Sequence, residues 1–135
     1  MINKINVFFV EAIDQVSPSG RLLQIFELFD YIGEKTSHLT EGLLEVHIIT
    51  TDPDYRRQGM AKALVDVTEE LARNNRLRGV KMACTSEFSA KLAQSLAYKE
   101  SYRLAYSDYK DGEGRQVFFP PKIHTHVKLY TKEFT

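Results

Sequence analysis

Segments rich in Val, Ile, Phe and Tyr recur along the chain and predict strands of a sheet. The five predicted strands cover residues 5–12, 43–51, 80–84, 102–109 and 123–132. The run from Leu43 to Thr51 is the most continuously apolar of them, as expected for a strand at the centre of a sheet.

Between these strands, apolar residues recur three or four positions apart, which is the spacing of one helix face. The predicted helices cover residues 21–36, 59–74 and 87–96. The second helix is expected to turn Met60, Leu64, Val67 and Leu71 toward the core, and Ser86 is expected to cap the third.

The alternation of strand and helix in the middle of the chain implies a parallel crossover, and the last two strands suggest an antiparallel edge. The predicted fold class is therefore α/β, with a mixed sheet. Proline and glycine residues mark short turns along the chain, but they form no linker long enough to divide domains. Residues 1–135 are therefore expected to form a single domain.

Composition narrows the classes of function. Lys and Arg number 18, as do Asp and Glu, so the formal net charge of zero argues against a nucleic-acid partner. The single cysteine, Cys84, excludes an internal disulfide and a multi-thiolate metal site. No apolar run approaches the roughly 20 residues of a membrane span, and the first residues lack a signal-peptide pattern. We therefore expect no membrane partner and a cytoplasmic location.

Residues 43–62, LLEVHIITTDPDYRRQGMAK, carry the clearest chemical signal. A buried strand leads into a loop and then into a helix start at Gly59, where unpaired amides and the helix dipole favour a pyrophosphate. Gly59 lets the backbone approach an anion, and Lys62 adds positive charge. Neither a P-loop nor a GxGxxG motif is present. An ordinary structural turn is the alternative.

The pattern Arg56-x-x-Gly59-x-Ala61 resembles the R/Q-x-x-G-x-G/A pyrophosphate loop of the GNAT acetyltransferase superfamily. The likeness continues through residues 85–90, 96–98, 108–109, 120–121 and 124–126. In this order the set is similar to insect-type arylalkylamine (dopamine-like) N-acetyltransferases, over most of the chain from Arg21 onward.

The resemblance implies a GNAT-like, mostly antiparallel mixed sheet with a central, splayed parallel pair of strands flanked by helices. Relatives carry a further N-terminal strand and helices that wall the amine pocket and supply an acidic catalytic residue. The sequence lacks a counterpart, so we expect an N-terminally truncated domain. An exposed sheet edge would favour self-association, with a homodimer as the expected form.

The resemblance also implies acetyl-CoA as cosubstrate, with no metal. Ile49, Thr50 and Thr51 would offer backbone groups to the pantetheine and the thioester carbonyl. The pyrophosphate would be held, mostly through amides, by Arg57, Gln58, Gly59, Met60, Ala61 and Lys62.

The predicted catalytic residues are His47, Thr85 and Ser89. His47 stands where vertebrate arylalkylamine acetyltransferases carry a base histidine, and its ordinary pKa of about 6.5 suits that work. A packed histidine on a central strand is the commoner alternative. Thr85 and Ser89 match hydroxyl positions proposed to relay a proton to the thiolate, although capping explains Ser89 almost as well. The family's acid tyrosine is replaced by Ala93.

Other residues carry weaker alternatives. Cys84 is expected to be apolar filler rather than a nucleophile paired with His47. His124 and His126 would share a strand face, but two histidines make a weak metal site. Ala97 replaces the family's turn glycine, which is acceptable if its φ stays negative. A set of aromatic residues is expected in packing, with an acceptor-pocket role as the alternative: Tyr106, Tyr109, Phe118 and Phe119.

The resulting hypothesis is an acetyl-CoA-dependent N-acetyltransferase whose arylalkylamine substrate attacks the thioester directly in a ternary complex. Dopamine, tyramine, serotonin and tryptamine are substrates of this type. One alternative is a CoA-binding or interaction module that lacks catalysis, and another is a transferase acting on peptides or other amines.

Overall fold

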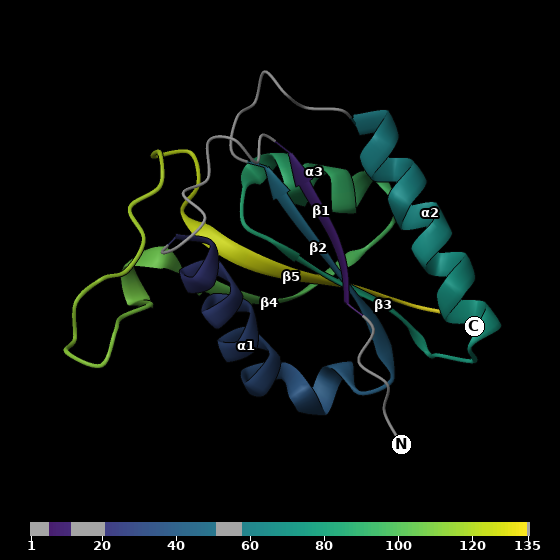
Figure 1. Cartoon of the computed structure of the whole chain (residues 1–135), viewed down its shortest axis with the longest axis horizontal. Helices are drawn as coiled ribbons and strands as arrows, with labels where there is room; N and C mark the ends of the chain where they lie inside the picture. Colours follow the sequence, from purple (N-terminus) through teal and green to yellow (C-terminus); the bar gives the residue numbers. More distant parts are fainter. Residues whose placement is uncertain (1–5, 12–20, 51–57, 135) are drawn as a thin grey trace.

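The computed structural model describes residues 6–11, 21–50 and 58–134 (Figure 1). The strands are β1 (Asn6–Glu11), β2 (Leu43–Thr50), β3 (Gly79–Cys84), β4 (Lys99–Ala105) and β5 (His126–Glu133). The helices are α1 (Arg21–Thr40), α2 (Gln58–Asn74) and α3 (Glu87–Ser95), and a short 3₁₀ turn, η3 (Tyr106–Asp108), follows β4. Of the helices in these ranges, none has the length and apolar character that a bilayer crossing requires.

The strands form one sheet in the order β1-β2-β3-β5-β4. β2 runs parallel to both β1 and β3, whereas β5 runs antiparallel to both β3 and β4. This confirms the mixed α/β sheet and its antiparallel edge. The expected central parallel pair is β2–β3, and β1 adds a second parallel pair because α1 carries the chain back before β2 begins.

Helices cover both faces of the sheet, and the alternation of side chains along the strands feeds two separate cores. The face covered by α2 and α3 holds one core, whose members include Val46, Val65, Met82, Cys84, Ala90, Ala93 and Tyr130. The face covered by α1 holds the other, whose members include Leu28, Phe29, Ile32, Ala83, Val127 and Leu129. Which face a residue occupies therefore decides which neighbours it can reach.

The predicted buried stripe of α2 is wrong at Val67 and Leu71, whereas Leu64 is half-buried and the side chain of Met60 is not among those described. Val67 is 62% exposed and Leu71 36% exposed, while Thr68 and Glu69 are buried. Thr68 donates its hydroxyl to the carbonyl of Leu64 at 2.7 Å, and Glu69 accepts a hydrogen bond from Tyr98 at 2.8 Å. Because these polar groups have partners, α2 can bury its mixed face and leave part of its apolar stripe in solvent.

The turn after α3 also departs from the prediction. Ala97 has a φ of 69°, not the negative value expected, and Tyr98 donates its N–H to the Ala93 carbonyl at 3.0 Å. These features close the helix with a left-handed residue, as glycine usually does. The chain turns so tightly that β4 starts at Lys99 rather than at residue 102, and η3 replaces the end of the predicted strand.

Candidate active site

The carboxyl ends of β2 and β3 lie at one edge of the sheet, where α2 and α3 begin (Figure 1). The first amides of a helix lack partners within the helix, and its dipole places partial positive charge at this end. Two helix starts beside two strand ends therefore supply N–H donors and a favourable field for an anionic ligand. This edge is the candidate site.

Some of the residues predicted to hold the cosubstrate are described by the structure, and these lie at this edge. Ile49 and Thr50 end β2, and Gln58, Gly59, Met60 and Ala61 form the first turn of α2, followed by Lys62. Thr51 and Arg57 lie outside the described residues. The described part of the predicted motif therefore ends β2 and begins α2.

β2 continues beyond its described ladder with β3. The last pair of that ladder is Ile48 with Cys84, whereas Ile49 and Thr50 pair on the other side, with β1. Neighbouring strand residues direct their backbone groups to opposite sides, so one of these two directs an N–H and a C=O away from β1. A ligand that contains amides can satisfy such groups.

Lys62 lies on the solvent side of α2. Its side chain is 60% exposed, and its Nζ lies 3.3 Å from Asp66 Oδ2, one helical turn further on. Because solvent screens such a pair, the interaction is weak and leaves the ammonium able to meet a phosphate.

His47 is packed against α1 at the centre of the sheet. It is 4% exposed, and its ring stacks on Phe29 with centroids 4.3 Å apart. Its Nε2 lies 3.1 Å from Glu45 Oε1, and its Nδ1 is buried as well. This burial favours the packed interpretation of His47, and its role as a base stays a prediction.

Glu45 joins His47 to a network that sequence reasoning missed. Lys81, directly opposite Glu45 on β3, places its Nζ 3.5 Å from Glu45 Oε2 and 3.4 Å from the hydroxyl of Thr40 at the end of α1. Burial raises the pKa of Glu45, but the hydrogen bond with His47 and the charge of Lys81 outweigh it, so the pKa lies below its ordinary value. The i, i+2 spacing of Glu45 and His47 was a visible signal, since it places both on one strand face.

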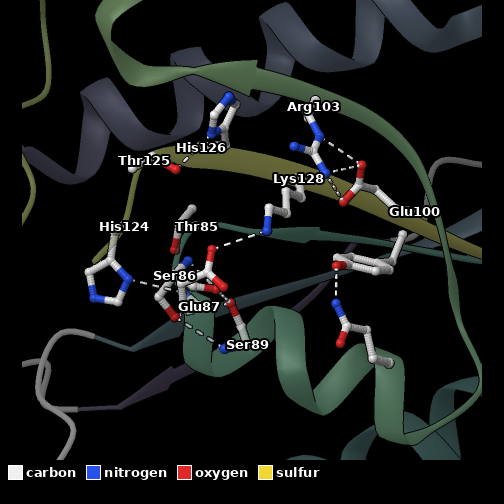
Figure 2. Close-up of polar contacts among 12 residues, drawn as sticks. Thr85, Ser86, Glu87, Ser89, Glu100, Arg103, His124, Thr125, His126 and Lys128 are labelled. Carbon is white, nitrogen blue, oxygen red and sulfur yellow. Dashed lines mark hydrogen bonds and ion pairs between the residues drawn. The ribbon is translucent and has the colours of Figure 1, made fainter. Parts of the chain in front are cut away.

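Ser86 and Ser89 form a reciprocal cap at the start of α3 (Figure 2). Ser89 donates its N–H to Ser86 Oγ at 3.1 Å, and Ser86 donates its N–H to Ser89 Oγ at 3.3 Å. Ser89 is 3% exposed, and its hydroxyl also donates to the Ser86 carbonyl at 3.1 Å. The predicted capping role is confirmed, and a relay role for Ser89 would have to coexist with it.

Two basic residues also meet the start of α3 (Figure 2). Glu87 donates its N–H to His124 Nδ1 at 3.0 Å, and Lys128 Nζ lies 3.0 Å from Glu87 Oε1. Burial lowers the pKa of His124, and Glu87 opposes that shift. His124 precedes β5 while His126 begins it, so the expected shared strand face is wrong. In the described ranges, no three potential metal ligands gather.

Cys84 lies in the core on the face of α2 and α3, and it is fully buried. His47 packs on the opposite face, against α1, so the two do not form a nucleophilic pair. Burial raises the pKa of the Cys84 thiol to about 12, which removes the thiolate that a nucleophile requires. The prediction of apolar filler is confirmed.

Tyr106 ties the segment after β4 to the end of β3. It is buried, and its hydroxyl donates to the Thr85 carbonyl at 2.5 Å. Burial raises the pKa of Tyr106 far above its ordinary value, so the phenol stays protonated. Thr85, the remaining predicted catalytic residue, is thereby fixed through its backbone at the candidate edge, one residue before the capping box.

A comparison with protein families finds one match. The profile of the acetyltransferase (GNAT) family matches residues 21–98, which is more than half of the 135 residues. The matched range contains β2, α2, β3 and α3, the elements that build the candidate site.

Solved structures of similar fold include insect acetyltransferases. A mosquito arylalkylamine N-acetyltransferase like 5b is 28% identical, with a TM-score of 0.66 over 85% of this chain and 55% of that one. A Drosophila melanogaster polyamine N-acetyltransferase, which catalyses the formation of N-acetylagmatine, is 27% identical, with a TM-score of 0.70 over 87% and 58%. An agmatine N-acetyltransferase is 26% identical, with a TM-score of 0.69 over 87% and 59%. The chain therefore spans between 55% and 59% of the length of these structures.

Proposed function

Because the chain belongs to the acetyltransferase (GNAT) family, we propose that it transfers the acetyl group of acetyl-CoA to the amine of an arylalkylamine. Dopamine, tyramine, serotonin and tryptamine represent this substrate class. Two observations support this substrate class. One is the set of motifs that begins at residues 85–90, and the other is the similarity to a mosquito arylalkylamine N-acetyltransferase. Agmatine, named for two of the similar structures, is the competing acceptor.

The observation that carries the proposal is the continuation of β2 past its ladder with β3, next to the start of α2. Acetyl-CoA would supply the reactive thioester. Backbone groups at Ile49 and Thr50 would pair with its amides and thioester carbonyl, which places an oxyanion donor near the reacting carbon. Amides at residues 58–61 would face the pyrophosphate, and Lys62 would add a cation at the same helix end.

The amine must lose a proton before it attacks the thioester. In the proposed reaction, His47 accepts this proton, directly or through water, while the Glu45 carboxylate, 3.1 Å from His47 Nε2, stabilises the imidazolium that forms. The neutral nitrogen then forms a bond to the thioester carbon, and the C–S bond breaks as the carbonyl double bond re-forms and the thiolate of CoA leaves. The nitrogen loses its second proton, which a hydroxyl of Thr85 or Ser89 relays to the thiolate, so that the hydroxyl regains the proton it gives.

A coupled assay for thiol release tests this function. Acetyl-CoA and tryptamine should give free thiol at a rate that saturates with tryptamine and that agmatine does not match. Turnover no faster than the protein-free blank, with tryptamine or with dopamine, would remove the proposed activity.

A second candidate function is a CoA-binding module without catalysis. Two observations favour it, namely the burial of His47 beneath Phe29 and the use of Ser89 in a helix cap. It predicts that acetyl-CoA raises the melting temperature while no amine is acetylated. Brisk turnover of any aryl amine would end this alternative.

A further inference from the structure

One face of α1 carries an acid, an aromatic ring and a base in a row. Glu27, Tyr31 and Lys35 follow one another at four-residue intervals, which stacks them along the helix. Glu27 and Lys35 are exposed, and Tyr31 is half-buried. Lys35 Nζ lies 5.5 Å from the centroid of the Tyr31 ring, so this ring already receives an ammonium group on its face.

The Tyr31 ring opens a series of aromatic contacts that leads toward the end of β3. Tyr31 meets Tyr109 edge-on with centroids 5.3 Å apart, and Tyr109 stacks with Phe118 at 5.8 Å. Phe118 in turn meets Tyr106 at 6.0 Å, and the Tyr106 hydroxyl holds the Thr85 carbonyl. The segment between β4 and β5 thus lies against α1, on the side where β3 ends (Figure 1).

The outer part of this series stays accessible to solvent, and its first ring, Tyr31, lies one helical turn from the acid Glu27. Tyr109 and Phe118 are only half-buried, and the N–H of Val117 donates to the Tyr109 carbonyl at 3.3 Å, which fixes the segment that carries both rings. Burial raises the pKa of Tyr109, and the negative charge of Glu27 raises it further.

We propose that Glu27, Tyr31, Tyr109 and Phe118 form a binding surface for a protonated arylalkylamine, the amine surface, separate from the acetyl-transfer edge. The aryl group of the ligand packs on the rings of Tyr109 and Phe118, and its ammonium meets the Glu27 carboxylate and the face of Tyr31. The surface collects the charged form of the amine beside the edge where the neutral form reacts. The choice of an arylalkylamine rests on the proposed function, while the recognition chemistry rests on these side chains.

Lys35 gives the amine surface a distinctive property. Its ammonium occupies the Tyr31 ring face that the ligand's ammonium would use, and the two positive charges repel. Removal of the Lys35 charge should therefore strengthen amine binding, whereas removal of the Glu27 charge should weaken it. A general loss of structure would weaken binding in both variants.

The sequence contains no tryptophan, so the indole of tryptamine can be excited selectively at wavelengths longer than the absorption of the seven tyrosines. The experiment titrates the full chain into tryptamine without acetyl-CoA and measures fluorescence anisotropy, with agmatine as a competitor. We expect Glu27→Gln to weaken binding about threefold and Lys35→Met to strengthen it about twofold. We expect Tyr109→Leu to weaken binding about fivefold and Tyr109→Phe to restore it.

Matched controls are Glu34→Gln, the same charge change two turns further along α1, and Phe119→Ala, which removes a ring that is 78% exposed in the same segment. Neither should alter the anisotropy. The proposal is overturned if tryptamine does not bind, if agmatine competes as well as an aryl amine, or if the controls weaken binding as much as Glu27→Gln does. Because the readout needs no acetyl transfer, a protein that binds tryptamine without acetylating it contradicts the proposed function alone.

Discussion

At the scale of single residues, Ala97 occupies a backbone conformation that its β-carbon disfavours. Its φ of 69° lies in the left-handed region, where an L-residue is about 1–2 kcal/mol less stable than in the right-handed one. We predict that Ala97→Gly raises the free energy of unfolding by about 0.5–1 kcal/mol, since the greater entropy of glycine in the unfolded chain offsets part of the gain. Chemical denaturation measures the change directly.

Ala93 supplies the control, because it is buried inside α3 and removing its methyl group opens a small cavity there. Ala93→Gly should lower the free energy of unfolding by about 1 kcal/mol or more. Equal destabilisation by the two glycine substitutions would show that the turn is not strained at Ala97.

A second prediction at the scale of single residues concerns the pH dependence of the stabilisation by Glu45. Its pKa is lowered in the folded protein by His47 and Lys81, despite burial, from an ordinary value of 4.5. Its contribution to stability is therefore present above about that pH and is lost as the pH falls through the lower, folded value. Glu45→Gln should destabilise the protein most near neutral pH, and the difference from wild type should shrink in acid.

Urea denaturation at several pH values between neutral and acid measures this dependence. Glu34→Gln, an exposed change on α1, should give a small difference that does not vary with pH in the same way. A Glu45→Gln difference that is constant with pH would mean that the Glu45–His47–Lys81 network does not depend on the carboxylate charge.

At the scale of elements, the pairing of β3 with β5 depends on Gly79. A β-carbon at this position would lie 2.0 Å from the backbone oxygen of Lys132 and 2.9 Å from Cα of Glu133. Backbone atoms cannot move aside as a flexible side chain can, so Gly79→Ala should separate the two strands locally. We predict a loss of about 3 kcal/mol or more in the free energy of unfolding.

A glycine-to-alanine substitution at Gly33 should change the free energy of unfolding in the opposite direction. Gly33 lies inside α1, and a β-carbon there would meet nothing within 4 Å, so Gly33→Ala should stabilise the protein by about 0.5–1 kcal/mol. Thermal unfolding of both variants tests the pair. A Gly79→Ala protein as stable as wild type would contradict the described register of β3 and β5.

Substitutions in the capping box of α3, formed by Ser86 and Ser89, can distinguish a structural role of Ser89 from a catalytic one. Ser86→Ala and Ser89→Ala each remove half of the reciprocal cap, so each should lower the free energy of unfolding by about 1 kcal/mol. If Ser89 also relays a proton to the thiolate, only Ser89→Ala should reduce turnover beyond what the loss of stability explains. Steady-state rates measured well below both melting temperatures distinguish the two roles.

At the scale of the whole molecule, the positions of the strands and helices along the chain could be predicted from the sequence, because the local spacing of apolar residues determines them. The strands, the helices and the start of α2 at the cosubstrate motif follow from residues close together in the chain. The orientation of α2 did not follow. Glu69 is buried by partners on other elements, the hydroxyl of Tyr98 and the ammonium of Lys132, which no local pattern reveals.

The same limit applies to the candidate site. The described residues of the Leu43–Lys62 motif, 43–50 and 58–62, belong to one short stretch of sequence, so their place at the sheet edge could be predicted. The contact of His124 with the start of α3 joins residues 37 positions apart, and Phe29 covers His47 from another element. Sequence spacing predicts which face of a strand a side chain occupies, but not which helix lies over it.

The central claim is that acetyl-CoA binds where β2 leaves its ladder with β3 and α2 begins. Isothermal titration calorimetry of the 135-residue chain with acetyl-CoA tests it most directly, with Gly59→Glu as the control, since a carboxylate there would repel the pyrophosphate. We expect saturable heat at one site from the wild type, and a parallel denaturation at 100 times the dissociation constant should show about 2.7 kcal/mol of added stability, with both effects absent from the variant. No heat from the wild type, or equal heat from Gly59→Glu, would contradict it.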